Sequence, residues 1–242
     1  MRILIVTAHA DDETIGCFTV MREQAAEVHI LHATDSVPRN LFFALRAGFL
    51  TRQAYRAARR EEMQAVLAKA GIPAARYHRL DFADQEAAQH CRQIRECVRA
   101  YSADRIYTHA YEGGHPDHDT LAFALAGLPN VWEFPLYHAY GASVVPQTFL
   151  DGQPEVTANL DPAARQTKLD WLHLFRSQRR DIKIFPIERE LFRPMRAYDF
   201  SRPPHVGRLY YEVHKLGSTW PEWRAAVGKS IEQREFTLGR SA

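Results

Sequence analysis

Strand-length apolar segments alternate with helix-like segments through the first half of the chain. The first of them, residues 2–7 (RILIVT), is a largely apolar run of strand length. Segments that fit strands, though not all of them apolar, follow at 27–33, 76–80, 104–110 and 131–138, and helical patterns separate them at 14–26, 40–70 and 84–100. Strands that alternate with helices predict a parallel sheet, because neighbouring parallel strands need a crossover connection. We therefore expect an α/β fold: a Rossmann-like, open, mostly parallel sheet with helices on both faces.

The pattern becomes less regular after about residue 140. Residues 147–152 and 155–160 resemble a short hairpin. Asp161 followed by proline is a typical helix start, and this helix is expected to extend to about Arg180. The remaining segments mix proline, arginine and aromatic residues, which predicts an irregular C-terminal cap.

The length of 242 residues suits a chain that buries a sizeable core without disulfides. We expect a single domain over residues 1–242, in which 1–140 form the α/β core and 141–242 shape a substrate cleft.

The charge balance limits the partners that the chain is expected to have. Lys and Arg number 31 against 29 Asp and Glu, so the net charge is +2, too small for a chain that wraps nucleic acid. The 3 cysteines form no CxxC pair, and no apolar run approaches the ~20 residues that span a bilayer. We expect a reduced, cytoplasmic protein without a transmembrane segment that acts on a small molecule. A peripheral membrane contact and a homo-oligomer remain open.

A histidine and three acids directly follow the first predicted strand. Residues 8–13 read AHADDE, so His9 and Asp12 are spaced to reach one metal ion. In open α/β sheets, ligands bind outside the carboxyl ends of the strands, where this loop lies. Alternatively, Asp11 or Asp12 caps the following helix and His9 is a surface residue.

A second polar loop follows the fourth predicted strand. Residues 113–119 read GGHPDHD, which places His115 and His118 on either side of Asp117. Histidines at this spacing suit metal binding or acid–base chemistry. Alternatively, the segment is a solvated turn, because Gly-Gly and Pro-Asp are turn dipeptides and Asp119 can cap a helix.

The two loops point to one site when the sheet order is considered. If the strands are ordered 3-2-1-4-5, strands one and four are neighbours and both loops flank the crevice where the winding reverses. Histidines and carboxylates without cysteine match a catalytic zinc site that keeps an open position for water. Three N and O ligands also accept other divalent metals.

These loops resemble the motifs of the LmbE-like or PIG-L family of zinc-dependent N-deacetylases. The family motif AHPDDE corresponds to residues 8–13, with Ala10 in place of its proline, and the motif HPDH corresponds to residues 115–118. Residues 59–62 (RREE) resemble the family's R-x-x-E helix, and residues 177–178 resemble its Ser-Gln pair. The likeness is good over the first 125 residues and thin beyond them.

The resemblance implies roles for particular residues. The implied zinc ligands are His9, Asp12 and His118. Asp11 would be the base that takes a proton from a zinc-activated water. His115 would stabilise the tetrahedral intermediate as an imidazolium and protonate the departing amine, while Asp117 would tune it and raise its pKa.

Arg59 is expected to contact the substrate by the same resemblance. Alternatively, it lies on a solvated helix face and pairs with Glu62. Some family members have a tyrosine where this chain has Gly113, and Tyr111 and Tyr107 are candidates to replace it. The arginines between 46 and 60 either form a solvated face or bind a phosphate or an anionic lipid head group.

The leading functional hypothesis is a metal-dependent hydrolase that removes the acetyl group from an N-acetylated amino sugar, a GlcNAc-type conjugate. The first alternative is a zinc amidase that acts on another N-acyl compound or a thiol-sugar conjugate. The second is a module that binds a nucleotide sugar or a metal without hydrolysis. The histidines other than His9, His115 and His118 are predicted to be structural or exposed.

Overall fold

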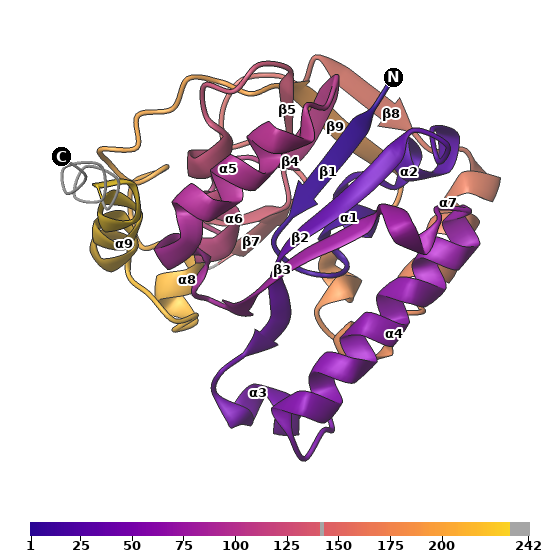
Figure 1. Cartoon of the computed structure of the whole chain (residues 1–242), viewed down its shortest axis with the longest axis horizontal. Coiled ribbons are helices and arrows are strands. Elements are labelled where there is room, and N and C mark those ends of the chain that lie inside the picture. Colours follow the sequence, from indigo (N-terminus) through magenta and orange to yellow (C-terminus); the bar gives the residue numbers. More distant parts are fainter. Residues whose placement is uncertain (141–142, 233–242) are drawn as a thin grey trace, which may run out of the picture.

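A computed structural model of the chain describes residues 1–140 and 143–232 (Figure 1). Within these residues, a central sheet has the strand order β3-β2-β1-β4-β5-β9-β8. The strands are β1 (Ile3–Thr7), β2 (Val28–Pro38), β3 (Tyr77–Asp84), β4 (Arg105–His109), β5 (Val131–Phe134), β8 (Val156–Asn159) and β9 (Arg189–Pro194). The first five strands are parallel. At the β5 edge, β9 pairs antiparallel with β5, and β8 pairs antiparallel with β9. The predicted α/β fold and the order 3-2-1-4-5 are confirmed.

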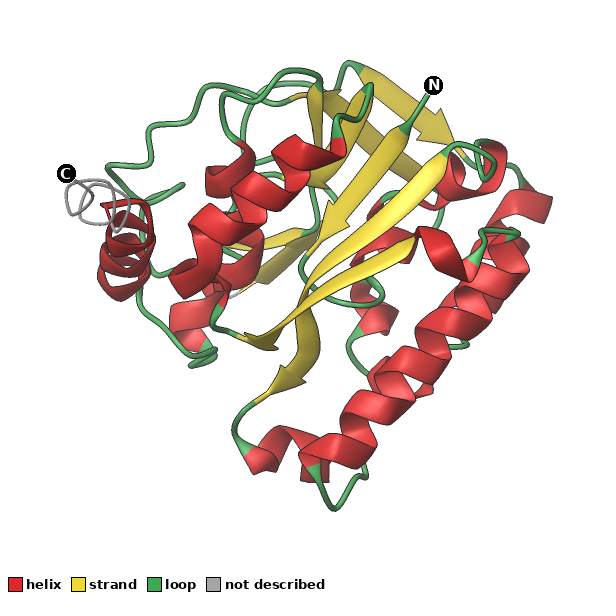
Figure 2. Ribbon diagram, in the orientation of Figure 1, coloured by secondary structure: helices red, strands yellow, loops and turns green. Residues whose placement is uncertain are grey.

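Helices cover both faces of the sheet (Figure 2). Ile3 and Ile5 of β1 lie in one core cluster with residues of α1, α2, α4 and α7, whereas Leu4 and Val6 lie in a second cluster with residues of α5, α6 and α9. Both faces are therefore buried, which explains the continuous apolar run of this strand. These helices are α1 (Asp12–Gly16), α2 (Phe18–Glu23), α4 (Arg52–Ala70), α5 (Cys91–Tyr101), α6 (Pro116–Leu125), α7 (Pro162–Leu172) and α9 (Trp220–Glu232).

Shorter elements connect these strands and helices. A separate two-stranded sheet pairs β6 with β7. The bounds of the short elements are β6 (Tyr137–Tyr140), β7 (Ser143–Pro146), α3 (Leu41–Arg46), α8 (Tyr210–Val213), η1 (Ala74–Arg76), η2 (Ala87–His90), η3 (Arg176–Gln178) and η4 (Ile182–Ile184), where η marks a 3-10 turn.

The predicted first helix is two helices, α1 and α2, that meet at Cys17. Side chains from the second half of the chain bind the backbone at this break. Lys168 donates to the carbonyl of Ile15 at 2.7 Å, and Glu190 accepts the N–H groups of Phe18 and Thr19 at 2.9 Å. The backbone groups released by the break are therefore satisfied by residues that sequence periodicity does not connect to this helix.

The predicted helical stretch at 40–70 is also divided. Gly48, with a φ of 90°, separates α3 from α4, and the Thr51 hydroxyl accepts the N–H of Ala54 at the start of α4. The helix ends at Gly71, which adopts the left-handed conformation as predicted, with a φ of 70°.

The predicted hairpin of 147–152 and 155–160 is wrong. Val156–Asn159 forms β8 but pairs with β9, about thirty residues later in the chain. Asp161 caps α7 as predicted, but the helix ends at Leu172 rather than near Arg180. The strand pairing is nonlocal, so the local pattern could not reveal the partner.

No helix in the described part of the chain is long and apolar enough to cross a membrane.

Candidate active site

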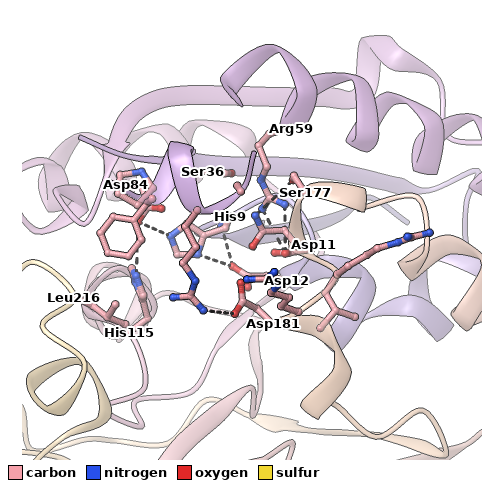
Figure 3. Close-up of a pocket in the computed structure, with 18 of the residues that line it drawn as sticks. His9, Asp11, Asp12, Ser36, Arg59, Asp84, His115, Ser177, Asp181 and Leu216 are labelled. Carbon is pink, nitrogen blue, oxygen red and sulfur yellow. Dashed lines mark hydrogen bonds and ion pairs between the residues drawn. The ribbon is translucent and has the colours of Figure 1, made fainter. Parts of the chain in front are cut away.

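The loops that follow β1 and β4 lie side by side at the carboxyl edge of the sheet, because these parallel strands are neighbours. The first loop carries His9 and leads into α1, and the second carries His115 and leads into α6. The imidazole rings of His9 and His115 meet with their centroids 4.6 Å apart; Figure 3 shows the two side chains beside Asp84. Of the predicted site residues, all but Asp117 line one pocket, and Asp117 is fully buried beside it.

Three predicted ligand atoms form a nearly equilateral triangle. Nδ1 of His9 lies 3.3 Å from Oδ2 of Asp12 and 3.3 Å from Nε2 of His118. The same Asp12 oxygen lies 3.3 Å from Nε2 of His118. Tetrahedral bonds of about 2.0 Å to a zinc ion would separate two ligand atoms by about 3.3 Å. The donor set and its spacing therefore fit a divalent metal with three protein ligands and one open position.

Two carboxylates face the other ring nitrogen of His9. Its Nε2 lies 3.2 Å from Oδ1 of Asp84 and 3.4 Å from Oδ2 of Asp117. The Asp117 carboxylate is itself fixed, because it accepts the N–H groups of Gln85 at 2.7 Å and Ala87 at 3.0 Å. Burial by itself lowers the pKa of His9, but the neighbouring carboxylates raise it well above its usual value. These contacts orient the imidazole so that its Nδ1 points toward Asp12 and His118.

Asp11 occupies a strained turn between His9 and α1. Its φ is 124°, in a region that side chains rarely adopt, and its N–H donates to the Glu13 carboxylate at 3.1 Å. Burial raises the pKa of Asp11 to about 8, although Arg59 lowers it. A carboxylate with a raised pKa beside the triangle is suited to accept a proton near neutral pH.

Arg59 of α4 reaches the pocket and is 3% exposed, so the alternative of a solvated helix face is wrong. Its Nη2 lies 3.4 Å from Oδ2 of Asp11, and the guanidinium also donates to the carbonyl of Ala10. Figure 3 shows Arg59 directed at Asp11. This arginine therefore fixes the first loop by contacts from α4, and it also lines the pocket.

His115 caps α6 and binds the backbone of its own loop. Its Nδ1 accepts the N–H of Asp117 at 3.2 Å, and its Nε2 lies 3.6 Å from Oδ1 of Asp84. The Asp117 carboxylate is more distant, at 3.9 Å from Nδ1. Burial lowers the pKa of His115 to about 4, helped by His9, whereas Asp117 and Asp84 raise it. The predicted influence of Asp117 therefore has the predicted direction, but desolvation outweighs it.

Two buried residues at the site were not predicted from the sequence. Asp84 ends β3, and the strand was expected to stop at residue 80; Asp81 has a φ of 56° and the register shifts nearby. His109 ends β4, stacks on His118 with ring centroids 4.0 Å apart, and accepts the N–H of Ala8 at Nε2. Their position at the carboxyl ends of parallel strands is the signal that could have identified both.

Tyr137 is one of three tyrosines that line the pocket in the described part of the chain, and Tyr111 and Tyr107 are not among them. Tyr137 comes from β6, lines the pocket, and its ring lies 5.6 Å from that of His118. The Tyr111 hydroxyl instead donates to the carbonyl of Arg202 at 3.0 Å. Sequence spacing could not identify Tyr137, because it follows a different strand.

The pocket extends outward from the triangle and encloses about 870 Å³. One wall is α3 and the turn after it, and the opposite wall is the segment 176–185. Glu62 of α4 fixes this segment, since its carboxylate accepts the N–H of Ser177 at 2.8 Å and its hydroxyl at 2.7 Å. The neighbouring Gln178 donates to the hydroxyl of Tyr55. The R-x-x-E helix and the Ser-Gln pair therefore meet in space.

The fold is shared with solved structures of deacetylases. The zinc-inhibited form of teicoplanin deacetylase Orf2 superposes with a TM-score of 0.56 at 15% identity, covering 74% of this chain and 85% of that one. The A40926 pseudoaglycone deacetylase Dbv21 gives 0.56 at 16% identity, covering 81% and 99%. The N,N'-diacetylchitobiose deacetylase from Pyrococcus horikoshii gives 0.55 at 16% identity, covering 79% and 82%. At these identities, the comparisons establish the fold alone.

Sequence comparison assigns the family. No curated protein matches the chain. The family model described as PIG-L: GlcNAc-PI de-N-acetylase matches residues 4–127, slightly more than half of the 242 residues. This range contains both polar loops, β2 to β4 and all but the first residue of β1. The chain therefore belongs to the PIG-L family of GlcNAc-PI de-N-acetylases.

Proposed function

We propose that the protein is a metal-dependent hydrolase that removes the acetyl group from an N-acetylated amino sugar conjugate. The observation that carries this proposal is the triangle of His9 Nδ1, Asp12 Oδ2 and His118 Nε2, with Asp11 and His115 on its pocket side. A three-ligand site with carboxylate and imidazole neighbours is typical of metal-assisted hydrolysis rather than of a structural metal.

His9, Asp12 and His118 would hold the metal, and zinc is the proposed ion because its usual bond lengths match the ligand spacing. When bound, such an ion lowers the pKa of a coordinated water and polarises an acyl oxygen. Asp84 and Asp117 would keep His9 in the orientation that presents Nδ1, because both face its Nε2.

Asp11 is the proposed general base. It would accept a proton from the water that attacks the amide carbon, and its raised pKa supports this role. Arg59 and the Glu13 carboxylate hold the loop, so the base has a defined position. Solvent access is restricted, since Asp11 is 8% exposed.

His115 is the residue proposed to stabilise the acyl oxygen and to protonate the departing amine. Because Nδ1 accepts the N–H of Asp117, the neutral ring carries its hydrogen at Nε2 and can donate a hydrogen bond to the acyl oxygen that becomes negative. In its protonated form, His115 would supply the proton that the amine needs when the carbon–nitrogen bond breaks. Asp117 and Asp84 favour this form electrostatically, although burial holds the pKa of His115 at about 4.

The substrate class is supported by the family and by the size of the pocket. A cavity of about 870 Å³ exceeds what one sugar ring fills, so a conjugate with a sizeable aglycone is proposed. The structural neighbours that act on teicoplanin-type molecules and on diacetylchitobiose share this fold.

The test is acetate release from a panel of N-acetylglucosamine conjugates by the zinc-loaded protein. Asp11→Asn should lower kcat by about 100-fold or more at unchanged metal content, whereas the matched exposed control Asp170→Asn should behave like the wild type. Undiminished turnover by Asp11→Asn would reject the assigned base. Preference for longer N-acyl groups would favour the general amidase, and stoichiometric metal without any turnover would favour a binding module.

A further inference from the structure

Asp119 is a fully buried carboxylate that has no part in the proposed reaction steps. It lies in the first turn of α6, four residues after His115 and next to His118. In the part of the chain that the structure describes, no lysine or arginine pairs with it. A buried carboxylate without a cation is costly unless hydrogen bonds hold it, so its hydrogen bonds indicate its role.

The Asp119 carboxylate reaches back to the start of its own loop. Its Oδ1 accepts the N–H of Glu112 at 3.1 Å and the N–H of Gly113 at 3.0 Å. The residue that caps α6 is His115, whose Nδ1 accepts the N–H of Asp117. The alternative in which Asp119 caps a helix is therefore wrong, and its carboxylate binds the loop instead.

These hydrogen bonds close the second polar loop into a ring from Glu112 to Asp119. Within the ring, the N–H of Asp119 donates to the carbonyl of His115 at 3.1 Å. Gly113 has a φ of 74°, and the glycine after it adds further conformational freedom. Because both glycines lie inside the ring, directly before His115, the carboxylate restricts the movement that they would otherwise allow this histidine.

Two other contacts hold the same loop, one residue each. The Glu112 carboxylate accepts the N–H of Leu136 at 2.8 Å, and the carbonyl of Gly113 accepts the N–H of Tyr210 at 2.9 Å. The first contact comes from the segment after β5 and the second from α8. The Asp119 carboxylate binds both loop residues at once, so its loss should increase the mobility of the loop most.

We propose that Asp119 is a positioning residue for His115: its carboxylate fixes the second polar loop and so keeps the imidazole of His115 beside the candidate metal site. The inference rests on the proposed function, in which His115 protonates the departing amine. The ring of His115 lies 4.6 Å from that of His9, centroid to centroid. Misplacement of a reacting group by about 1 Å can lower a rate about 100-fold. A mobile loop should therefore reduce turnover even while the metal stays bound.

The test separates the hydrogen bonds of Asp119 from its charge. Asp119→Asn keeps an oxygen that can accept both N–H groups, whereas Asp119→Ala leaves both N–H groups without this partner. The matched control is Asp161→Ala, which removes another carboxylate that accepts a backbone N–H, that of Ala164 at 2.7 Å. All three variants remove one negative charge. Asp119→Ser carries the same expectations as Asp119→Ala and replaces it if that variant does not fold.

Steady-state kinetics and metal analysis of the zinc-loaded protein are the first readouts. Asp119→Ala should lower kcat by about 100-fold, with a KM close to that of the wild type and stoichiometric metal. Asp119→Asn and the control should keep a kcat close to that of the wild type.

Three kinetic results would overturn the proposal. The first is an undiminished kcat in Asp119→Ala. The second is an equal loss of kcat in Asp119→Asn, which would assign the effect to the charge. The third is a loss of metal in proportion to kcat, which would place the effect on the neighbouring His118.

Hydrogen exchange measured by mass spectrometry is a readout that does not need turnover. The amides of Glu112 and Gly113 should exchange at least about 10-fold faster in Asp119→Ala, because each loses a hydrogen bond to a charged group. Exchange should stay close to the wild type in Asp119→Asn and in the control, and unchanged exchange in Asp119→Ala would overturn the proposal. If the wild type hydrolyses no conjugate, the proposed function fails, and hydrogen exchange still decides whether Asp119 fixes the loop.

Discussion

Glu62 of α4 accepts two hydrogen bonds from Ser177, one from its backbone N–H at 2.8 Å and one from its hydroxyl at 2.7 Å. This contact joins the helix that carries Arg59 to the segment 176–185, which lines the pocket. It fixes one wall of the pocket relative to the loop of Asp11, which Arg59 also contacts.

Replacing Glu62 should therefore affect both stability and substrate binding. Glu62→Gln keeps one acceptor but loses the charge and one hydrogen bond, so we expect a loss of about 1–2 kcal/mol in the free energy of unfolding and a raised KM. Urea denaturation and steady-state kinetics measure these effects. Glu61→Gln, an exposed neighbour on α4, is the control. A KM unchanged from wild type would show that the contact between Glu62 and Ser177 does not shape the pocket.

Metal content should depend on the predicted ligands and not on His109. His118→Ala should lose stoichiometric divalent metal by elemental analysis, and chelation of the wild type should lower its Tm, because metal binding stabilises the folded state. His109→Gln should keep the metal, since its Nε2 already accepts the N–H of Ala8. His173→Ala is the exposed control. Loss of metal in His109→Gln with retention in His118→Ala would reverse the assignment.

The buried ion pair of Lys168 and Glu190 should be important for stability. Their charged atoms are 2.7 Å apart, and both side chains are fully buried. Lys168→Met should lower the free energy of unfolding by about 3–5 kcal/mol, because Glu190 would keep an unpaired buried charge. The double variant with Glu190→Leu should not recover this loss, since Glu190 also accepts hydrogen bonds from Phe18 and Thr19. Chemical denaturation of the single and double variants, with the exposed Lys183→Met as the control, tests both expectations.

Gly114→Ala should disturb the second loop directly. A Cβ at this position would lie 2.0 Å from the carbonyl oxygen of Tyr137, and backbone cannot move aside as a flexible side chain does. Because His115 is the next residue, we expect a large loss of activity and a smaller loss of thermal stability. The helical control Gly228→Ala meets only an Arg224 nitrogen, at 3.3 Å, and should be neutral or stabilising by about 0.5–1 kcal/mol. Full activity in Gly114→Ala would contradict the expectation that a side chain at this position displaces His115.

His138 should make stability depend on pH in the acidic range. Burial lowers its pKa to about 4 from the usual 6.5, with a contribution from His205. The unfolded chain therefore binds an additional proton between these values, so stability falls as the pH decreases from about 6.5 to about 4. Glu112, 3.9 Å from Nδ1, is the facing acid, and burial raises its pKa.

The measurement is the midpoint of urea denaturation as a function of pH, for the wild type and for His138→Asn. The variant should show a shallower decrease between pH 6.5 and 4.5, because the titrating imidazole is absent. Parallel curves would indicate that His138 does not contribute to the acid sensitivity.

The sequence alone was sufficient to predict that the two polar loops meet. His9 and Asp12 follow one strand, and His115 and His118 follow another, so the order of the sheet brings the loops together. This succeeded because the carboxyl ends of neighbouring parallel strands meet at one edge, a consequence of local alternation between strand and helix.

The tertiary structure decided what surrounds that site. Asp84, Tyr137 and the arginines of segment 176–185 reach the pocket from elements that are distant in the sequence, and β8 pairs with β9 rather than with an adjacent strand. Periodicity reports which face of an element is buried but not which distant element covers it. The meeting of the two motifs was therefore readable from the sequence, whereas the side chains that orient His9 and line the rest of the pocket depend on nonlocal packing.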